Sequence, residues 1–132
     1  MESEYKMKQV FPVKILALEG EDLEVTITIL YDGGCHDMKF QMKKTDEPGK
    51  YIDLSTKNVM NVERLPVKDY AIFLCEGQHE GKLFRIAKLM GKNPEENPEA
   101  LEQFKKFTQR KGFQQESIYV PKQKDACVSE NN

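Results

Sequence analysis

Apolar and polar residues alternate through most of the first ninety residues of this 132-residue chain. In one such stretch the apolar side chains share one parity: Leu23, Val25, Ile27 and Ile29. A period of two is typical of a strand with one buried face, because successive side chains point to opposite faces. The alternation therefore predicts a β-sheet protein.

Seven runs of this kind follow one another, with turn residues between them. They cover residues 13–18, 23–29, 36–42, 50–54, 59–65, 69–76 and 82–90. Gly33 and Gly34 permit the positive φ angles of a tight hairpin turn. Parallel strands would need helical crossovers between them, so the sequence predicts an antiparallel sandwich or up-and-down barrel. A further short strand is predicted at 118–120.

The pattern changes after residue 96 to that of one amphipathic helix at 97–111. Asn97 suits the N-cap, Pro98 the first helical position, and Gly112 the left-handed residue that ends a helix. One face carries Leu101, Phe104, Phe107 and Thr108. The basic C-terminal end is interpreted as a solvated face that complements the helix dipole rather than as a binding patch. We expect a single domain over 1–132, with an irregular N-terminus at 1–10 and a polar tail at 122–132.

Charge and hydropathy exclude two classes of partner. The chain has 20 Lys and Arg against 22 Asp and Glu, with a pI near 5.8, so it offers no large basic field for nucleic acid. The longest apolar run, Ala71 to Cys75, is far shorter than the ~20 residues of a membrane span. Residues 1–10 lack the apolar core of a signal peptide, which by itself predicts a cytosolic chain.

The reactive residues form no recognisable catalytic or metal motif. Cys35, Cys75 and Cys127 include no Cys-x-x-Cys pair; one disulfide with one free thiol and three free thiols both remain open. Of the two histidines, His79 is predicted to lie in a polar hairpin tip at 76–81. We expect no enzymatic activity, no cofactor and no metal.

A lysine interrupts the apolar face of the seventh run. Phe84, Ile86, Lys88 and Met90 share one parity. If that face points inward, Lys88 places an amine in a cavity, where it could meet a polar group of an apolar ligand. The alternative is that Lys88 lies near a barrel end and extends into water. The pattern alone favours this second interpretation.

Four segments in order resemble the lipocalins, in particular the tear lipocalin and odorant-binding branch. They are KTDEPGKY at 44–51, VKDYAIFLCEG at 67–77, GKLFRIAKLMGK at 81–92 and PEALEQF at 98–104. Asp69-Tyr70 matches the second lipocalin motif, with Lys68 in place of its usual threonine. Gly91-Lys92 matches the third motif, with lysine in place of arginine. The Gly-x-Trp motif of strand A has no counterpart, so the resemblance implies strands B to H without strand A.

The family resemblance implies an eight-stranded antiparallel barrel with an outer C-terminal helix and an apolar cavity for small lipophilic molecules. Without strand A, two sheet edges would stay open, through which copies could dimerise. The resemblance pairs Cys35 with Cys127 and makes Cys75 an unpaired cysteine that faces the cavity. It also aligns Lys88 with a pocket lysine, which reverses the preference stated above. The residues expected to contact ligand are Ile15, Leu30, Met38, Phe40, Phe73, Cys75, Ile86 and Lys88.

The implied function is binding and transport of small hydrophobic molecules such as odorants, fatty acids or lipids. The implied location is extracellular, against the cytosolic prediction from residues 1–10. Two alternatives remain open at this stage: a truncated isoform without carrier function, and a protease-inhibitory or interaction protein. No membrane insertion is expected.

Overall fold

Seven strands form one antiparallel sheet, in which each strand pairs with the next along the chain. The computed structural model describes residues 9–130. The strands are β2 (Lys14–Ala17), β3 (Leu23–Tyr31), β4 (Gly34–Lys44), β5 (Lys50–Asp53), β6 (Val59–Arg64), β7 (Tyr70–His79) and β8 (Lys82–Gly91). The predicted seven-stranded antiparallel fold is confirmed.

Two hairpins have turns of two residues. Asp32 and Gly33 join β3 to β4, and Glu80 and Gly81 join β7 to β8; all four have positive φ angles. This conformation matches the right-handed twist of the flanking strands and holds their register. The predicted hairpin tip at 76–81 was too long, because residues 76–79 continue the pairing of β7 with β8.

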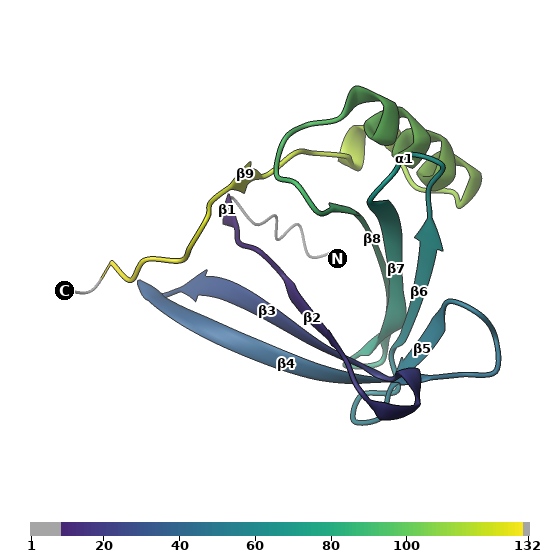
Figure 1. Cartoon of the computed structure of the whole chain (residues 1–132), viewed down its shortest axis with the longest axis horizontal. Helices are drawn as coiled ribbons and strands as arrows, with labels where there is room; N and C mark the ends of the chain where they lie inside the picture. The colour runs from purple at the N-terminus through teal and green to yellow at the C-terminus, as the bar shows by residue number, and fades with distance from the viewer. Residues whose placement is uncertain (1–8, 131–132) are drawn as a thin grey trace.

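The sheet is curled into a half-barrel. In Figure 1, β2–β4 and β6–β8 form two arms that meet at the short strand β5. The outer edges of β2 and β8 pair with no other strand among residues 9–130. Among residues 9–130 the sheet is therefore open along one side, as the family resemblance implied for strands B to H.

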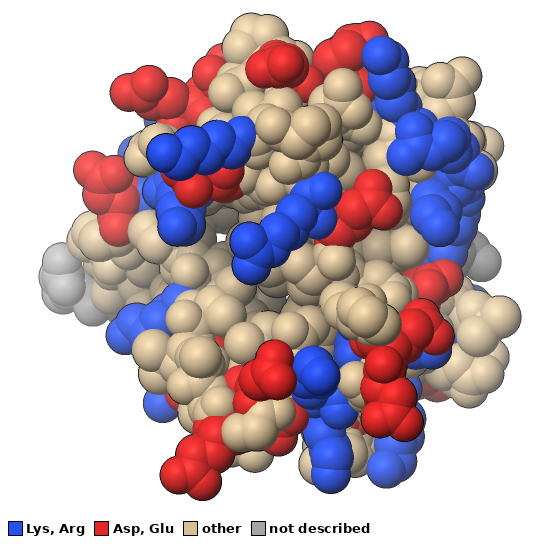
Figure 2. Space-filling model, turned by 45° about the vertical axis from the view of Figure 1, so that its right-hand side comes forward, with Lys and Arg blue, Asp and Glu red and all other residues tan. Residues whose placement is uncertain are grey.

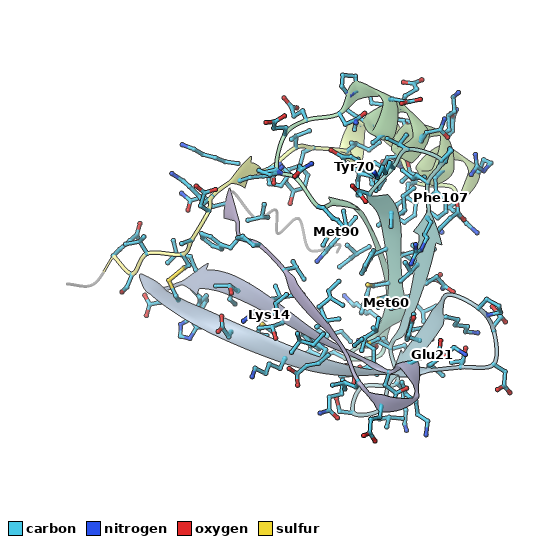
Figure 3. All side chains as sticks on the ribbon, in the orientation of Figure 1. Lys14, Glu21, Met60, Tyr70, Met90 and Phe107 are labelled. Atoms are coloured by element: carbon cyan, nitrogen blue, oxygen red, sulfur yellow. A yellow bond between two sulfur atoms is a disulfide. The ribbon has the colours of Figure 1, made fainter. Side chains whose placement is uncertain are left out.

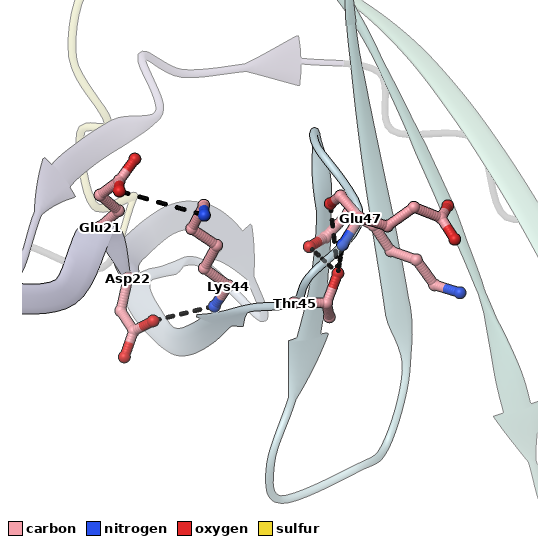
Figure 4. A network of polar contacts seen from close by, with 6 residues as sticks. Glu21, Asp22, Lys44, Thr45 and Glu47 are labelled. Atoms are coloured by element: carbon pink, nitrogen blue, oxygen red, sulfur yellow. Dashed lines mark hydrogen bonds and ion pairs between the residues drawn. The ribbon is translucent and has the colours of Figure 1, made fainter.

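Polar contacts hold the turn between β2 and β3 against the end of β4 (Figure 4). The Lys44 backbone N–H donates to Asp22 Oδ1 over 2.8 Å, and Lys44 Nζ lies 4.0 Å from Glu21 Oε2. In the next turn, Thr45 Oγ1 donates to the Lys50 carbonyl over 2.8 Å. Most of these groups are exposed, so each contact contributes little to the stability of the fold. Their main effect is to orient the chain at the two turns.

Helix α1 (Pro98–Arg110) is capped at both ends by local hydrogen bonds. Asn97 Oδ1 accepts from the Ala100 backbone N–H over 3.0 Å. At the other end, Gly112 N–H donates to the Gln109 carbonyl and Phe113 N–H to the Thr108 carbonyl. These two bonds are the Schellman pattern, which needs the positive φ angle of Gly112, here 85°. No helix among residues 9–130 is long and apolar enough to cross a membrane.

Helix α1 covers the outer face of β7 and β8. Ile72 and Leu74 of β7 form a buried cluster with Phe104 and Phe107 of α1, and Ile72 is 0% exposed. Figure 3 shows Phe107 on this outer side, and Met60 and Met90 on the concave side of the sheet. The outer apolar parity of β7 is therefore explained by the helix, which lies outside the sheet as the family resemblance implied.

The segments at the two ends of the chain are more ordered than predicted. Gln9–Val10 (β1) and Lys122–Gln123 (β9) pair as parallel strands, although 1–10 was expected to be irregular and 122–132 a polar tail. Residues 1–8 and 131–132 lie outside the described part. The predicted strand at 118–120 was wrong: within residues 9–130 these residues pair with no other strand, and Ile118 packs on the helix cluster instead. Pairing begins only after Pro121, which has no N–H to donate.

A disulfide joins Cys35, at the start of β4, to Cys127. This is the pairing that the family resemblance implied. Beside it, Ser129 Oγ donates to the Gly33 carbonyl over 3.0 Å. The C-terminal segment is thereby tied to the β3–β4 hairpin, far along the chain from it.

Candidate functional site

The strand register places one set of apolar side chains on the concave face. Ile15 pairs with Val25, and Val25 pairs with Phe40. In the other arm, Met60 pairs with Cys75, Cys75 with Ile86, and Phe73 with Lys88. Paired residues share a face of a sheet, so both arms present this set to the space between them.

The concave face is filled at its centre and uncovered at its margins. Val25, Met42 and Met60 are buried in one cluster. By contrast, Ile15 on edge strand β2 is 39% exposed and Ile86 on edge strand β8 is 47% exposed. Removing apolar surface from water stabilises the folded state, and these two side chains are only partly removed from water. The margins therefore retain apolar surface that a ligand could cover.

Seven of the eight predicted ligand-contact residues share this concave face. Phe40, Phe73 and Cys75 pack beside the central cluster, while the side chains of Ile15, Met38, Ile86 and Lys88 are exposed. Leu30 does not join them. It pairs with Cys35 and has the opposite parity to Ile27 and Ile29, so the pleat of β3 directs it to the other face.

Cys75 and Lys88 are diagonal neighbours across β7 and β8. Cys75 is the free cysteine of the described residues and is half-buried. Burial raises the pKa of the Cys75 thiol, and the nearby Lys88 ammonium offsets part of that rise. Lys88 therefore lies on the concave face with its charge close to the thiol, and it remains in contact with water.

Several concave residues were absent from the predicted set. Met60 and Val62 of β6, Tyr51 of β5 and Ile27 of β3 all pack around the central cluster. The alternation within 59–65 was sufficient to place Met60 and Val62 on one face. Tyr51 was harder to assign, since β5 has only four residues.

Other parts of the described surface offer less to a ligand. A depression of about 440 Å³ is lined by Thr45, Asp46, Glu47, Lys50 and Ile52. It opens widely to solvent, so a ligand held there would keep much of its surface in contact with water. Among residues 9–130, no cluster of three or more His, Cys, Asp or Glu side chains could hold a metal.

Comparison with known sequences agrees with this geometry. Residues 1–125 match the model of the lipocalin / cytosolic fatty-acid binding protein family. The chain belongs to this family. It is 48% identical over 120 residues to odorant-binding protein 2a of Mus musculus, covering 90% of this chain and 68% of that protein. It is 42% identical over 127 residues to lipocalin-1 of Sus scrofa, covering 96% and 72%.

Two further comparisons extend the relationship. Vomeronasal secretory protein 1 of Mus musculus is 35% identical over 130 residues, covering 98% of this lipocalin chain and 71% of that protein. Among solved structures, the siderocalin Ex-FABP has a TM-score of 0.79 at 23% identity, covering 87% and 78%. The possum milk lipocalin trichosurin with bound 4-ethylphenol has a TM-score of 0.69 at 24% identity, covering 81% and 76%. These structures support the fold.

The Lys88→Met variant should slow alkylation of Cys75 by iodoacetamide. Removing the ammonium removes the charge that lowers the thiol pKa, so less thiolate is present at pH 8. We expect the rate, followed by mass spectrometry without reductant, to fall roughly two- to fivefold. Lys82→Met is the control, since Lys82 lies six residues away on the same face of β8. Equal rates in both variants would contradict the proximity of Lys88 to Cys75.

Proposed function

We propose that this lipocalin binds and carries small hydrophobic molecules on the concave face of its half-barrel and acts without catalysis. The observation that supports this most directly is the uncovered apolar surface on the concave face, where Ile15, Met38 and Ile86 are each about 40–50% exposed. On β7 and β8, the apolar residues of opposite parity are covered by α1, whereas Ile86 remains uncovered on the concave side.

The affinity would come mainly from apolar burial. A ligand that covers about 200 Å² of apolar surface gains ~5 kcal/mol at ~25 cal/mol per Å². Non-directional burial of this kind discriminates poorly between molecules of similar size, so we expect broad ligand selectivity. Lys88 would supply a charged group near the ligand and would orient acids or aldehydes.

The relatives support the class of ligand. Odorant-binding protein 2a of Mus musculus takes its name from odorants, and trichosurin was solved with 4-ethylphenol, a small apolar phenol. We infer odorants, fatty acids or related lipids as the ligands of this chain.

We also propose an extracellular location. Disulfides persist mainly in oxidising compartments, and this chain carries one between Cys35 and Cys127. The name of vomeronasal secretory protein 1 points in the same direction.

The Ile86→Gln variant should weaken binding of an environment-sensitive apolar probe such as N-phenyl-1-naphthylamine. The substitution places an amide on the apolar concave face, and we expect a loss of about three- to tenfold in affinity by fluorescence titration. Leu83→Gln is the matched control: Leu83 lies on the same strand with opposite parity and is 79% exposed.

The control should bind the probe as the wild type does, with saturation near one probe per chain and displacement by 4-ethylphenol. Equal losses in the two variants would show that the probe does not use the concave face. Non-saturable binding to the wild type would favour a lipocalin fold without carrier function.

The Lys88→Met variant should weaken displacement by decanoate more than displacement by decan-1-ol. Lys88 is exposed, so its ion pair with a carboxylate is screened and worth only about two- to fivefold in affinity. The comparison is made by competition against the same bound probe. Equal effects on displacement by the acid and by the alcohol would contradict the orienting role of Lys88. They would not contradict apolar binding at the concave face.

A further inference from the structure

Basic side chains gather at the C-terminal end of α1 and on the outer face of the neighbouring strand β8. They are Arg85, Lys105, Lys106, Arg110 and Lys111, all exposed. None of the five forms an ion pair with another residue within 9–130. Figure 2 shows basic side chains side by side at the upper right, on the side of the molecule that carries α1. We name these five residues the basic surface.

Three of these cations are held in place by aromatic rings. Arg85 lies 4.3 Å from the Phe113 ring centroid, and its Nη1 donates to the Lys111 carbonyl over 2.7 Å. Arg110 and Lys111 lie 5.9 Å and 5.6 Å from the Phe107 centroid. Side chains already positioned in this way lose less conformational entropy when they bind a partner.

The helix dipole explains only part of this charge. It places the equivalent of about half a negative charge at the C-terminus of a helix, and its effect fades within the last turn. Arg110 and Lys111 lie at this end of α1 and are sufficient to compensate that partial negative charge. Arg85 belongs to a strand, and Lys105 precedes the last turn of α1. The positive charge therefore exceeds what stabilising α1 requires.

Nearby carboxylates reduce this excess without cancelling it. Glu76 is the cross-strand neighbour of Arg85, Glu102 lies one turn before Lys106 on α1, and Glu116 follows the helix. Five cations against these three anions leave a net positive surface. The chain as a whole has a net charge of −2, so the sign of this region is opposite to that of the molecule.

Leu83 projects from the same outer face of β8. It is 79% exposed, more than any other large apolar residue of the described chain. Leu83 and Arg85 are two residues apart on one strand, so their side chains point the same way. An exposed leucine beside ordered cations is the combination by which proteins bind at the boundary between lipid headgroups and acyl chains.

We propose that the basic surface and Leu83 dock this lipocalin onto an anionic lipid bilayer. The cations contact the headgroups, and Leu83 inserts at the headgroup and acyl boundary. A soluble polyanion such as a sulfated polysaccharide would satisfy the cations but would leave Leu83 in water. This docking is a surface contact that needs no spanning segment, and it does not depend on ligand binding at the concave face.

The test measures partition of the whole chain onto sucrose-loaded vesicles by sedimentation. Vesicles of phosphatidylcholine with 30 mol% phosphatidylglycerol are compared with phosphatidylcholine alone at about 20 mM and 150 mM salt. We expect binding only to the anionic vesicles, and weaker binding at the higher salt. The Arg110→Gln/Lys111→Gln variant should bind about 30-fold more weakly, since each basic side chain near such a surface contributes about fivefold.

Two further variants separate this account from general charge effects. Leu83→Ser should weaken vesicle binding roughly fivefold and leave binding to a heparin column unchanged. Lys39→Gln/Lys43→Gln removes two positive charges from the outer face of β4 and should retain wild-type binding. Circular dichroism checks the fold of each variant.

Three results would overturn the proposal. The first is no difference between anionic and neutral vesicles. The second is an equal loss in the Lys39/Lys43 and Arg110/Lys111 variants, which would reduce the effect to net charge. The third is full vesicle binding by Leu83→Ser with equally tight binding to heparin, which would assign the surface to a soluble polyanion. None of these results bears on probe binding at the concave face.

Discussion

The packing of α1 against one face of the sheet determines how the other face can be used. Ile72 is completely buried between β7 and the helix, and Phe107 is 4% exposed. Once the helix seals that side, the next residues along the same strands, Phe73 and Cys75, must face the space between the two arms. The outer face of β7 and β8 is thus buried by the helix. The concave face is buried by its own side chains only at its centre, around Val25, Met42 and Met60.

The two arms are connected at opposite ends. At one end β5 pairs with both β4 and β6, and Val25 and Met42 pack with Met60 in the central cluster. At the other, the disulfide joins Cys35 to Cys127 across a sequence separation of 92, which is worth ~4–5 kcal/mol in the chain-entropy model. The disulfide ties the segment that follows α1 to the β3–β4 hairpin. The covalent link thereby limits how far the β2–β4 arm can separate from the arm that carries the helix.

Local patterns in the sequence predicted most of this architecture. The alternation in residues 13–90 gave the seven strands, and Asn97, Pro98 and Gly112 gave the helix bounds, because each signal acts within a few residues. The pairing of β1 with β9 was missed, since two-residue strands carry no periodicity and join distant segments. Leu30 was assigned to the concave face by alignment, although its parity within β3 already indicated the other face.

The most direct test of this account is methyl NMR of the chain labelled at isoleucine and methionine, titrated with 4-ethylphenol. The account predicts saturable shifts at Ile15, Met38 and Ile86 on the concave face, and little change at Ile72 beneath the helix. Shifts centred on Ile72, or no saturable shift at the concave residues, would contradict the claim that the uncovered concave face is the binding site.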